Sequence, residues 1–192
     1  MAGLVEIEDE IVVNICADKT QGKVSIYFDL PIQFPKQPPK KDILFYDKPK
    51  AEQYWQRKPL PDDLKKVKSM EEWMSMPEQF RKKYTNYITE EYKRRRNGVW
   101  FYNNGVPTYI TGNHYFFLQW CKIDIGYPSY LDFQRQLFIH LDACVADPRC
   151  VGQVYVKCRR SGYTNMSAAI LVNEGTQVKE KLLGIMSKTG TD

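Results

Sequence analysis

The segment that most constrains the fold of this chain runs from Val154 to Asn165 and reads VYVKCRRSGYTN. A β-branched run leads into a basic turn, then into Ser, Gly and Thr, and then into the helix-forming stretch 166–171. This order predicts a strand, a phosphate-binding loop and a helix, because a helix N-terminus presents unpaired N–H groups and a positive dipole end to an anion. Gly162 would let the backbone approach a phosphate closely, and Thr164 is placed to ligate Mg²⁺.

The loop departs in two places from the usual P-loop pattern, G-x-x-x-x-G-K-[ST]. Tyr163 occupies the position of the usual Lys, and Lys157 occupies that of the first Gly. A lysine at the front of the loop would still reach the β- and γ-phosphates from the other side. The alternative interpretation is a basic turn between an ordinary strand and an ordinary helix.

Size and composition suit one good core with a small accessory region, since the chain has 192 residues of which 43% are hydrophobic. The net charge of +5 permits contact with nucleic acid without establishing it. With five Cys, no CxxC pair and only two His, we expect reduced thiols and no zinc site. No stretch reaches the roughly 18 apolar residues of a membrane span, so no membrane association is expected.

The first third of the chain predicts a hairpin and a connector. Two β-branched runs, 11–15 and 23–28, flank the polar turn 18–22. Residues 31–61 are rich in Pro and Lys and break regular structure. We interpret them as a surface linker, with a flexible basic arm that touches DNA or a partner as the alternative.

Helices are expected over residues 62–97. Ser69 with Glu72 three residues later is typical of a capping box, and a second helix follows Pro77 and ends at Asn97-Gly98. The basic residues of this helix, including Arg94–Arg96, suggest contact with a phosphate backbone or an acidic partner. A solvated helix face is the alternative.

The aromatic stretch 99–126 predicts a small antiparallel unit. Asn104-Gly105 between two strand-like runs is a strong hairpin signal. We expect its aromatic side chains to form core and not a platform for stacking bases. His114 is interpreted as a hydrogen-bonded structural residue.

A helix is predicted from about residue 130 to 144, and it carries Phe133 and Gln134 ahead of the loop. A Gln amide can donate to and accept from an adenine edge while an aromatic ring packs on the base. Residues 151–156 and 181–187 are predicted to be core strands on either side of the loop helix. Strand, loop, helix and strand would form a parallel, right-handed βαβ unit, so the fold class is α/β.

These motifs together, Phe133-Gln134, the loop 157–164 and the segment 184–190, resemble the large terminase subunit of tailed bacteriophages. That family is a DNA-packaging motor with an N-terminal ATPase and a C-terminal nuclease. Some members have the same deviant loop, with Lys at its front and Tyr before the Ser or Thr. The resemblance implies the start of a P-loop ATPase core of ASCE type, incomplete here, over residues 98–192. Residues 1–97 would be an N-terminal extension of hairpin, connector and basic helices.

The resemblance also implies roles for individual residues with ATP and Mg²⁺ as cofactors. Gln134 would read the adenine, with Phe133 or Tyr130 beside the base. Lys157 would contact the phosphates and Thr164 the Mg²⁺ ion. The remaining loop residues that would line the nucleotide are Ser161, Gly162, Tyr163 and Asn165.

An arginine of the loop would act as an arginine finger and offset charge on the transferring phosphoryl group. Arg159 and Arg160 are the two candidates. No apolar run ending in Asp-Glu follows residue 190, and no carboxylate cluster for a two-metal nuclease is present. We therefore expect this chain to bind ATP–Mg²⁺ weakly and not to hydrolyse it alone.

The partners implied are double-stranded DNA, the portal protein and the small terminase subunit, with a pentameric ring of copies on the portal. The place implied is the host cell cytoplasm, transiently at the portal vertex of the procapsid. Two alternatives remain from the residues themselves: a superfamily-2-like helicase or translocase, and a non-catalytic virion docking protein with a vestigial loop.

Overall fold

The computed structural model describes residues 16–18, 23–25, 34–124, 126–146, 148, 150, 154–156 and 161–184. The strands are β1 (Cys16–Asp18), β2 (Lys23–Ser25), β3 (Val99–Asn103) and β4 (Val106–Ile110). The helices are the short 3₁₀ turns η1 (Lys40–Asp42) and η2 (Lys50–Glu52), and the α-helices α1 (Asp62–Lys65), α2 (Met70–Ser75), α3 (Glu78–Asn97), α4 (Gly112–Trp120), α5 (Asp132–Ala146) and α6 (Tyr163–Gly175). The described part of the protein is therefore mixed α and β.

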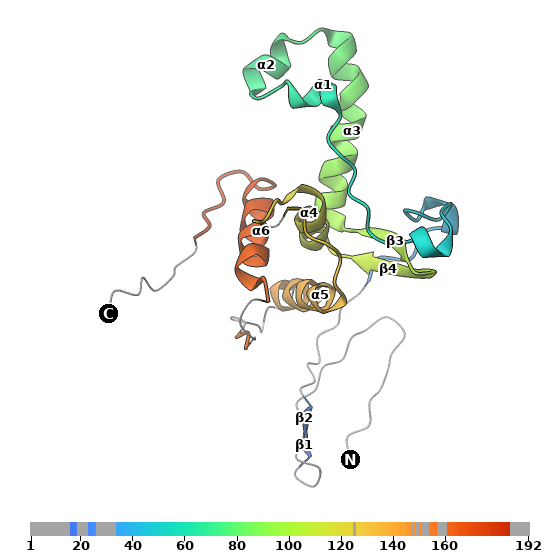
Figure 1. The fold of residues 1–192 in the computed structure, drawn as a ribbon. Helices are drawn as coiled ribbons and strands as arrows, with labels where there is room; N and C mark the ends of the chain where they lie inside the picture. Colours follow the sequence, from blue (N-terminus) through green and yellow to red (C-terminus); the bar gives the residue numbers. More distant parts are fainter. Residues whose placement is uncertain are drawn as a thin grey trace.

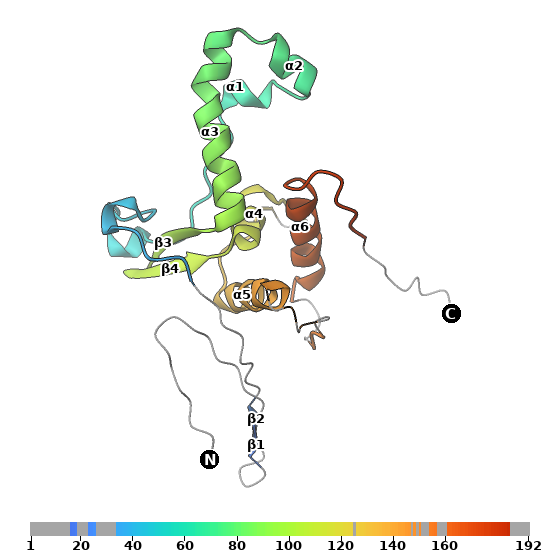
Figure 2. The ribbon, with the colours of Figure 1, turned by 180° about the vertical axis from the view of Figure 1, so that it is seen from behind.

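Helix α3 is the longest element and stands out from the rest (Figure 1). Helices α1 and α2 lie beside its far end, while α4, α5 and α6 gather near its other end. Seen from behind, the β3–β4 hairpin lies to one side of α4, with the segment that holds η1 and η2 next to it (Figure 2). The molecule thus has one dense region, from which α3 projects.

The predicted helix boundaries around α2 and α3 are confirmed. The Ser69 hydroxyl accepts a hydrogen bond from the Glu72 N–H (3.1 Å), and the Glu72 carboxylate accepts one from the Lys68 N–H (2.6 Å). Helix α3 begins directly after Pro77 and ends at Asn97, with Gly98 as its C-cap residue. Gly98 has a φ of 73°, a backbone conformation that glycine adopts with little strain.

The hairpin predicted at Asn104-Gly105 is present, and a second hairpin lies close to the one predicted from the runs 11–15 and 23–28. Strands β1 and β2 pair antiparallel, although β1 begins at Cys16, just after the run 11–15, which lies outside the described residues. In the β3–β4 hairpin, Asn104 and Gly105 both have positive φ (49° and 86°), as the tight turn requires.

The prediction that residues 31–61 form a surface linker is wrong for the part from Ile43 to Trp55. Leu44 makes a parallel bridge to Phe101, with backbone hydrogen bonds to Trp100 and Tyr102, and so extends the hairpin at the β3 edge. Ile43, Phe45 and Trp55 are buried. The sequence did not predict their burial, because these apolar side chains are spaced irregularly among Pro and Lys residues. They are buried only because the segment lies against β3.

The stretch after the hairpin is a helix and not part of an antiparallel unit. Helix α4 is capped by Thr111, whose hydroxyl accepts a hydrogen bond from the His114 N–H (3.3 Å). Every residue from Gly112 to Gln119 is buried. A helix that is buried on all sides has no polar face and shows no helical periodicity, which is why its sequence read as strand-like.

One aromatic core occupies the dense region, as expected for the aromatic side chains. Its buried members are Phe45, Trp55, Phe101, Ile110, Tyr115, Phe116, Phe117, Leu118, Leu137, Phe138, Met166 and Ala169. These residues come from both sides of the predicted division at residue 97, and they belong to the connector, the hairpin and the helices α4, α5 and α6.

The expected core strands beside α6 are not formed in their described parts. Residues 154–156 and 181–184 are outside regular structure, and Val154, Val156 and Leu182 are 94%, 92% and 97% exposed. A strand needs neighbours for its backbone hydrogen bonds, and within the described residues no strand lies beside either segment. The rest of each predicted strand, 151–153 and 185–187, lies outside the described residues.

Candidate functional site

The start of α6 has the backbone geometry predicted for the end of the loop. Gly162 is the N-cap residue and lies in the left-handed region (φ 75°, ψ 9°). A Cβ atom added there would meet no atom within 4 Å, so the backbone conformation, and not crowding, favours glycine. No side chain caps the helix. Its first N–H groups therefore have no acceptor among the described residues, which is the arrangement that attracts an anion.

The side chains around Gly162 divide between exposed and packed groups. Thr164 and Asn165 are exposed, with no hydrogen bond to another described side chain. The Ser161 hydroxyl is shielded from solvent and has no hydrogen-bond partner within the described residues. Tyr163 stacks on Tyr155 (4.8 Å between ring centroids, 11° between planes) and packs against the aromatic core. Thr164 is thus accessible to a metal ion, whereas Tyr163 anchors the start of the helix.

The charged residues assigned to phosphate contact and catalysis, Lys157, Arg159 and Arg160, lie outside the described residues. Their roles stay predictions. What the structure describes of the loop is its last part, Ser161 to Asn165.

The adenine-reading group lies on α5, where the sequence placed it, but its members have different surroundings. Gln134 is buried, and its Oε1 atom has no hydrogen-bond partner among the described residues. Phe133 is exposed. Tyr130 packs edge-on against Phe101, and its hydroxyl donates to the Asp132 carboxylate (3.1 Å). Burial raises the pKa of Tyr130 to about 12.

The two halves of the predicted site meet only through the core. Tyr130 and Tyr163 both pack against the aromatic core. Within the described part of the chain, no hydrogen bond joins Gln134 to the segment 161–165. The Gln134 oxygen is thus an unpartnered acceptor that is shielded from solvent.

His114 is fully buried, but the side-chain hydrogen bonds predicted for it are absent among the described residues, and its ring is held by stacking. Its ring stacks on Phe138 (4.7 Å) and on Tyr130 (5.7 Å). Neither ring nitrogen has a hydrogen-bond partner among the described residues. Burial, together with the charge of Arg135, lowers its pKa to about 3, so the imidazole is neutral at pH 7.

A buried polar cluster joins α3, α4, α5 and α6, and sequence reasoning missed it. The Arg95 Nε–H donates to Asn173 Oδ1 (2.9 Å), and Asn173 Nδ2 donates to Asn113 Oδ1 (2.8 Å). Asn113 Nδ2 lies 3.2 Å from the Glu174 carboxylate and 3.5 Å from that of Asp142. Asn is a poor helix former, so Asn113 and Asn173 inside apolar helical stretches were the available signal.

Asp142 is the titratable member of this cluster with the most altered pKa. Burial raises its pKa to about 6, and the nearby charge of Glu174 acts in the same direction. Hydrogen bonds from Asn113 and Thr111 oppose the rise. The cluster holds helices together at the end of α6 remote from Gly162.

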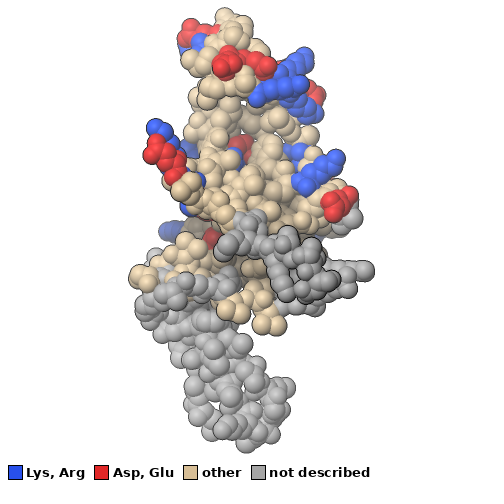
Figure 3. Space-filling view, turned by 90° about the vertical axis from the view of Figure 1, so that its left-hand side faces the viewer, with Lys and Arg blue, Asp and Glu red and all other residues tan. Residues whose placement is uncertain are grey.

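The basic residues near the end of α3 make contacts within the protein and do not form a continuous basic stripe on its surface. Arg94 pairs with buried Glu91 (2.5 Å), and the Arg95 guanidinium lies over the Phe116 ring (4.7 Å) as well as in the polar cluster. Arg96 is exposed. Figure 3 shows basic and acidic side chains mixed over the end of the molecule formed by α1, α2 and the far part of α3. The internal contacts of Arg94 and Arg95 fit neither of the two interpretations of this helix, since both of those placed the basic side chains in solvent or against a partner.

The basic and acidic side chains of α1 and α3 form ion pairs with one another. The pairs are Lys65–Asp62, Lys82–Glu78, Lys83–Asp63 and Lys93–Glu90. All are exposed, so each contributes little to stability.

Among the described residues, no group of three or more His, Cys, Asp or Glu could hold a metal ion. Among the helices of the described part, none has the length and apolar character to cross a membrane.

Comparisons with known proteins found no matching protein family, no matching curated protein and no matching solved structure.

Proposed function

We propose that this chain is the ATP-binding part of a viral DNA-packaging motor of the large-terminase type. The observation that carries the proposal is the start of α6, where Gly162 adopts a left-handed conformation and no side chain caps the helix. Open N–H groups at the start of a 13-residue helix suit the phosphates of a nucleotide. The order of Lys157, Ser161, Gly162 and Thr164 along the sequence supports the same interpretation.

In this proposal each residue keeps the role that the sequence suggested. Lys157 contacts the phosphates, and Arg159 or Arg160 offsets charge on the transferring phosphoryl group in the full motor. Bound Mg²⁺ would neutralise charge on the β- and γ-phosphates, with the exposed Thr164 hydroxyl as its protein ligand. Gln134 offers its unpartnered oxygen to the exocyclic amine of adenine.

The proposal extends to the partners of the motor. Hydrolysis of ATP by the assembled ring would drive double-stranded DNA into the procapsid, with the portal protein and the small terminase subunit as neighbours. Exposed Arg96 is the remaining candidate of its triplet for contact with the DNA backbone.

The decisive experiment is calorimetric titration of the purified chain with a non-hydrolysable ATP analogue, with Mg²⁺ and with EDTA. We expect Thr164→Ala to weaken binding at least about tenfold when Mg²⁺ is present and to have little effect in EDTA, because the hydroxyl acts through the metal. Ser167→Ala is the matched control, since it removes a hydroxyl one turn along the same helix.

An unchanged affinity in the Lys157→Ala, Thr164→Ala double variant would contradict the proposal. It would leave the docking protein with a vestigial loop as the better interpretation. Circular dichroism of each variant distinguishes loss of binding from loss of the fold.

A further inference from the structure

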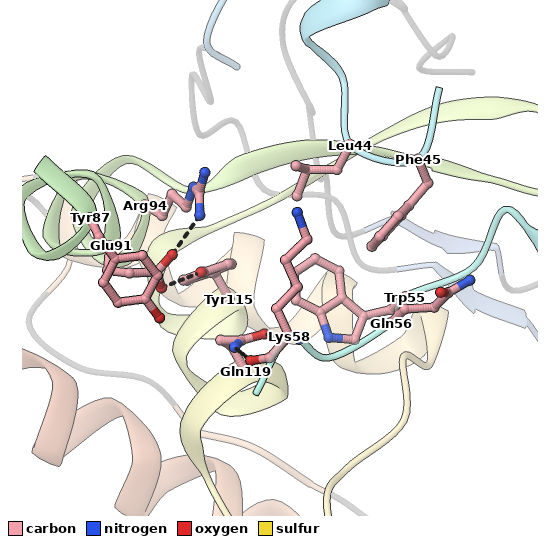
Figure 4. Close-up of a pocket in the computed structure, with 10 residues that line it drawn as sticks. All are labelled: Leu44, Phe45, Trp55, Gln56, Lys58, Tyr87, Glu91, Arg94, Tyr115 and Gln119. Carbon is pink, nitrogen blue, oxygen red and sulfur yellow. Dashed lines mark hydrogen bonds and ion pairs between the residues drawn. The ribbon is translucent and has the colours of Figure 1, made fainter. Parts of the chain in front are cut away.

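A pocket away from α6 lies between the connector, α3 and α4 (Figure 4). It is lined by Leu44, Phe45, Trp55, Gln56, Lys58, Tyr87, Glu91, Arg94, Tyr115 and Gln119. Its wall combines aromatic rings with charged side chains from segments far apart in the sequence. The nucleotide site proposed above includes none of these residues.

The acidic side chain of the pocket is already satisfied. Glu91 is buried, and its carboxylate accepts hydrogen bonds from the Tyr115 hydroxyl (2.5 Å) and from the Arg94 guanidinium (2.5 Å). Figure 4 shows these three side chains meeting at one side of the pocket. Because Glu91 and Arg94 cancel each other's charge, the pair leaves this side of the pocket neutral.

Two donors in the pocket have no acceptor among the described residues. The amine of Lys58 forms no ion pair with a described carboxylate, and the indole N–H of Trp55 is buried with no hydrogen-bond partner. A buried donor without an acceptor is uncommon and marks a position where a ligand group would be stabilised. In Figure 4 the Lys58 side chain runs across the pocket, in the view between Glu91 and the Trp55 ring.

Lys58 is held in place by its backbone. The Gln119 side chain accepts a hydrogen bond from the Lys58 N–H (3.2 Å) and donates one to the Lys58 carbonyl. The neighbouring Arg57 donates to the Gln119 carbonyl (2.9 Å). Gln119 is therefore a positioning residue, which fixes the base of the lysine while its amine stays exposed.

We propose that this pocket binds a monoanionic carboxylate attached to an apolar or aromatic group. The Lys58 amine and the Trp55 indole N–H would donate to the carboxylate, and the rings of Trp55 and Tyr87 would contact the apolar part. One net positive charge, from Lys58, matches a carboxylate better than a phosphate monoester, which carries about −1.5 to −2 at pH 7. The inference does not depend on the nucleotide site.

The test is an NMR titration that follows the indole N–H signal of Trp55, assigned with Trp55→Phe. We expect phenylacetate to shift this signal in a saturable manner and its neutral isostere phenylacetamide to bind at least about tenfold more weakly. Lys58→Gln should weaken phenylacetate binding about tenfold. Lys40→Gln is the matched control, because it removes an exposed lysine of the same connector that does not line the pocket.

Equal binding of phenylacetate and phenylacetamide, or equal binding by the wild type and Lys58→Gln, would overturn the proposal. Inorganic phosphate binding more tightly than phenylacetate would also overturn it. A capped peptide with one Glu beside a Phe distinguishes the source of the carboxylate. Tighter binding of the peptide than of phenylacetate assigns the pocket to an acidic side chain of a partner, and the reverse order assigns it to a small molecule.

Discussion

At the scale of single residues, ionisation of the Asp142 carboxyl makes the free energy of unfolding depend on pH. Its carboxyl keeps its proton to about pH 6 in the folded protein, whereas the ordinary value is 3.8. The folded state therefore binds more protons than the unfolded state between these values, and stability falls as the pH rises through this window. His114, with its pKa lowered to about 3, acts in the opposite direction, because acid protonates it first in the unfolded chain.

We predict that Asp142→Asn raises the free energy of unfolding at pH 7 by about 1–3 kcal/mol. The amide carbonyl can still accept the hydrogen bonds from Asn113 and Thr111, and no charge needs to be buried. This increase in the free energy of unfolding should fall towards zero as the pH is lowered from 6 to 4. Urea unfolding at several pH values measures it, and subtraction of the two profiles removes the contribution of His114. A gain that is the same at pH 4 and pH 7 would show that ionisation of Asp142 is not its cause.

At the scale of elements, the contact between α3 and α4 depends on Gly112. A Cβ atom at this position would lie 2.2 Å from the Arg95 carbonyl oxygen, which belongs to the backbone and cannot rotate away. The small residue lets the start of α4 pass close to the end of α3, and this closeness brings Asn113 to the polar cluster.

Gly112→Ala is therefore expected to lower the free energy of unfolding by about 2–3 kcal/mol, because the two helices must separate. Gly184→Ala is the control, since a Cβ atom there meets nothing within 4 Å. That variant should change stability by less than about 0.5 kcal/mol. Equal urea midpoints for the two variants would mean that α3 and α4 are not in this close contact.

Elements whose ends are marked by residues close together in the sequence could be predicted from the sequence, and elements that lack such marks could not. The Ser69–Glu72 capping box, the stop at Gly98 and the turn at Asn104-Gly105 each depend on residues close in sequence, so they are present as predicted. Helix α4 is buried on all sides and has no polar face to set its period. The positions of 154–156 depend on strand neighbours, which no local pattern supplies.

At the scale of the whole molecule, one core is shared across the predicted division at residue 97. Phe45 and Trp55 pack with Phe101, and they belong to the same core as residues of α4, α5 and α6. A chain of residues 98–192 would lose both of these side chains together with α3. We predict that it shows no cooperative unfolding transition, because its aromatic core would be open to water.

A chain of residues 34–192 keeps the whole described core and should unfold cooperatively. Thermal unfolding followed by near-ultraviolet circular dichroism compares the two, since this signal reports packed aromatic side chains. A cooperative transition in the 98–192 chain would instead support two independent units divided at residue 97.

The sequence by itself determined the local features of this protein, including the helix ends, the hairpin turns and the glycine at the start of α6, because their physical causes lie within a few residues. Only the tertiary structure decided which polar groups are satisfied. It placed the Tyr115 hydroxyl against Glu91, Arg95 against Asn173, and Lys58 in a pocket whose Glu91 carboxylate is already paired. Such pairings join residues from different elements, and burial makes each one matter by removing the water that would otherwise serve as its partner.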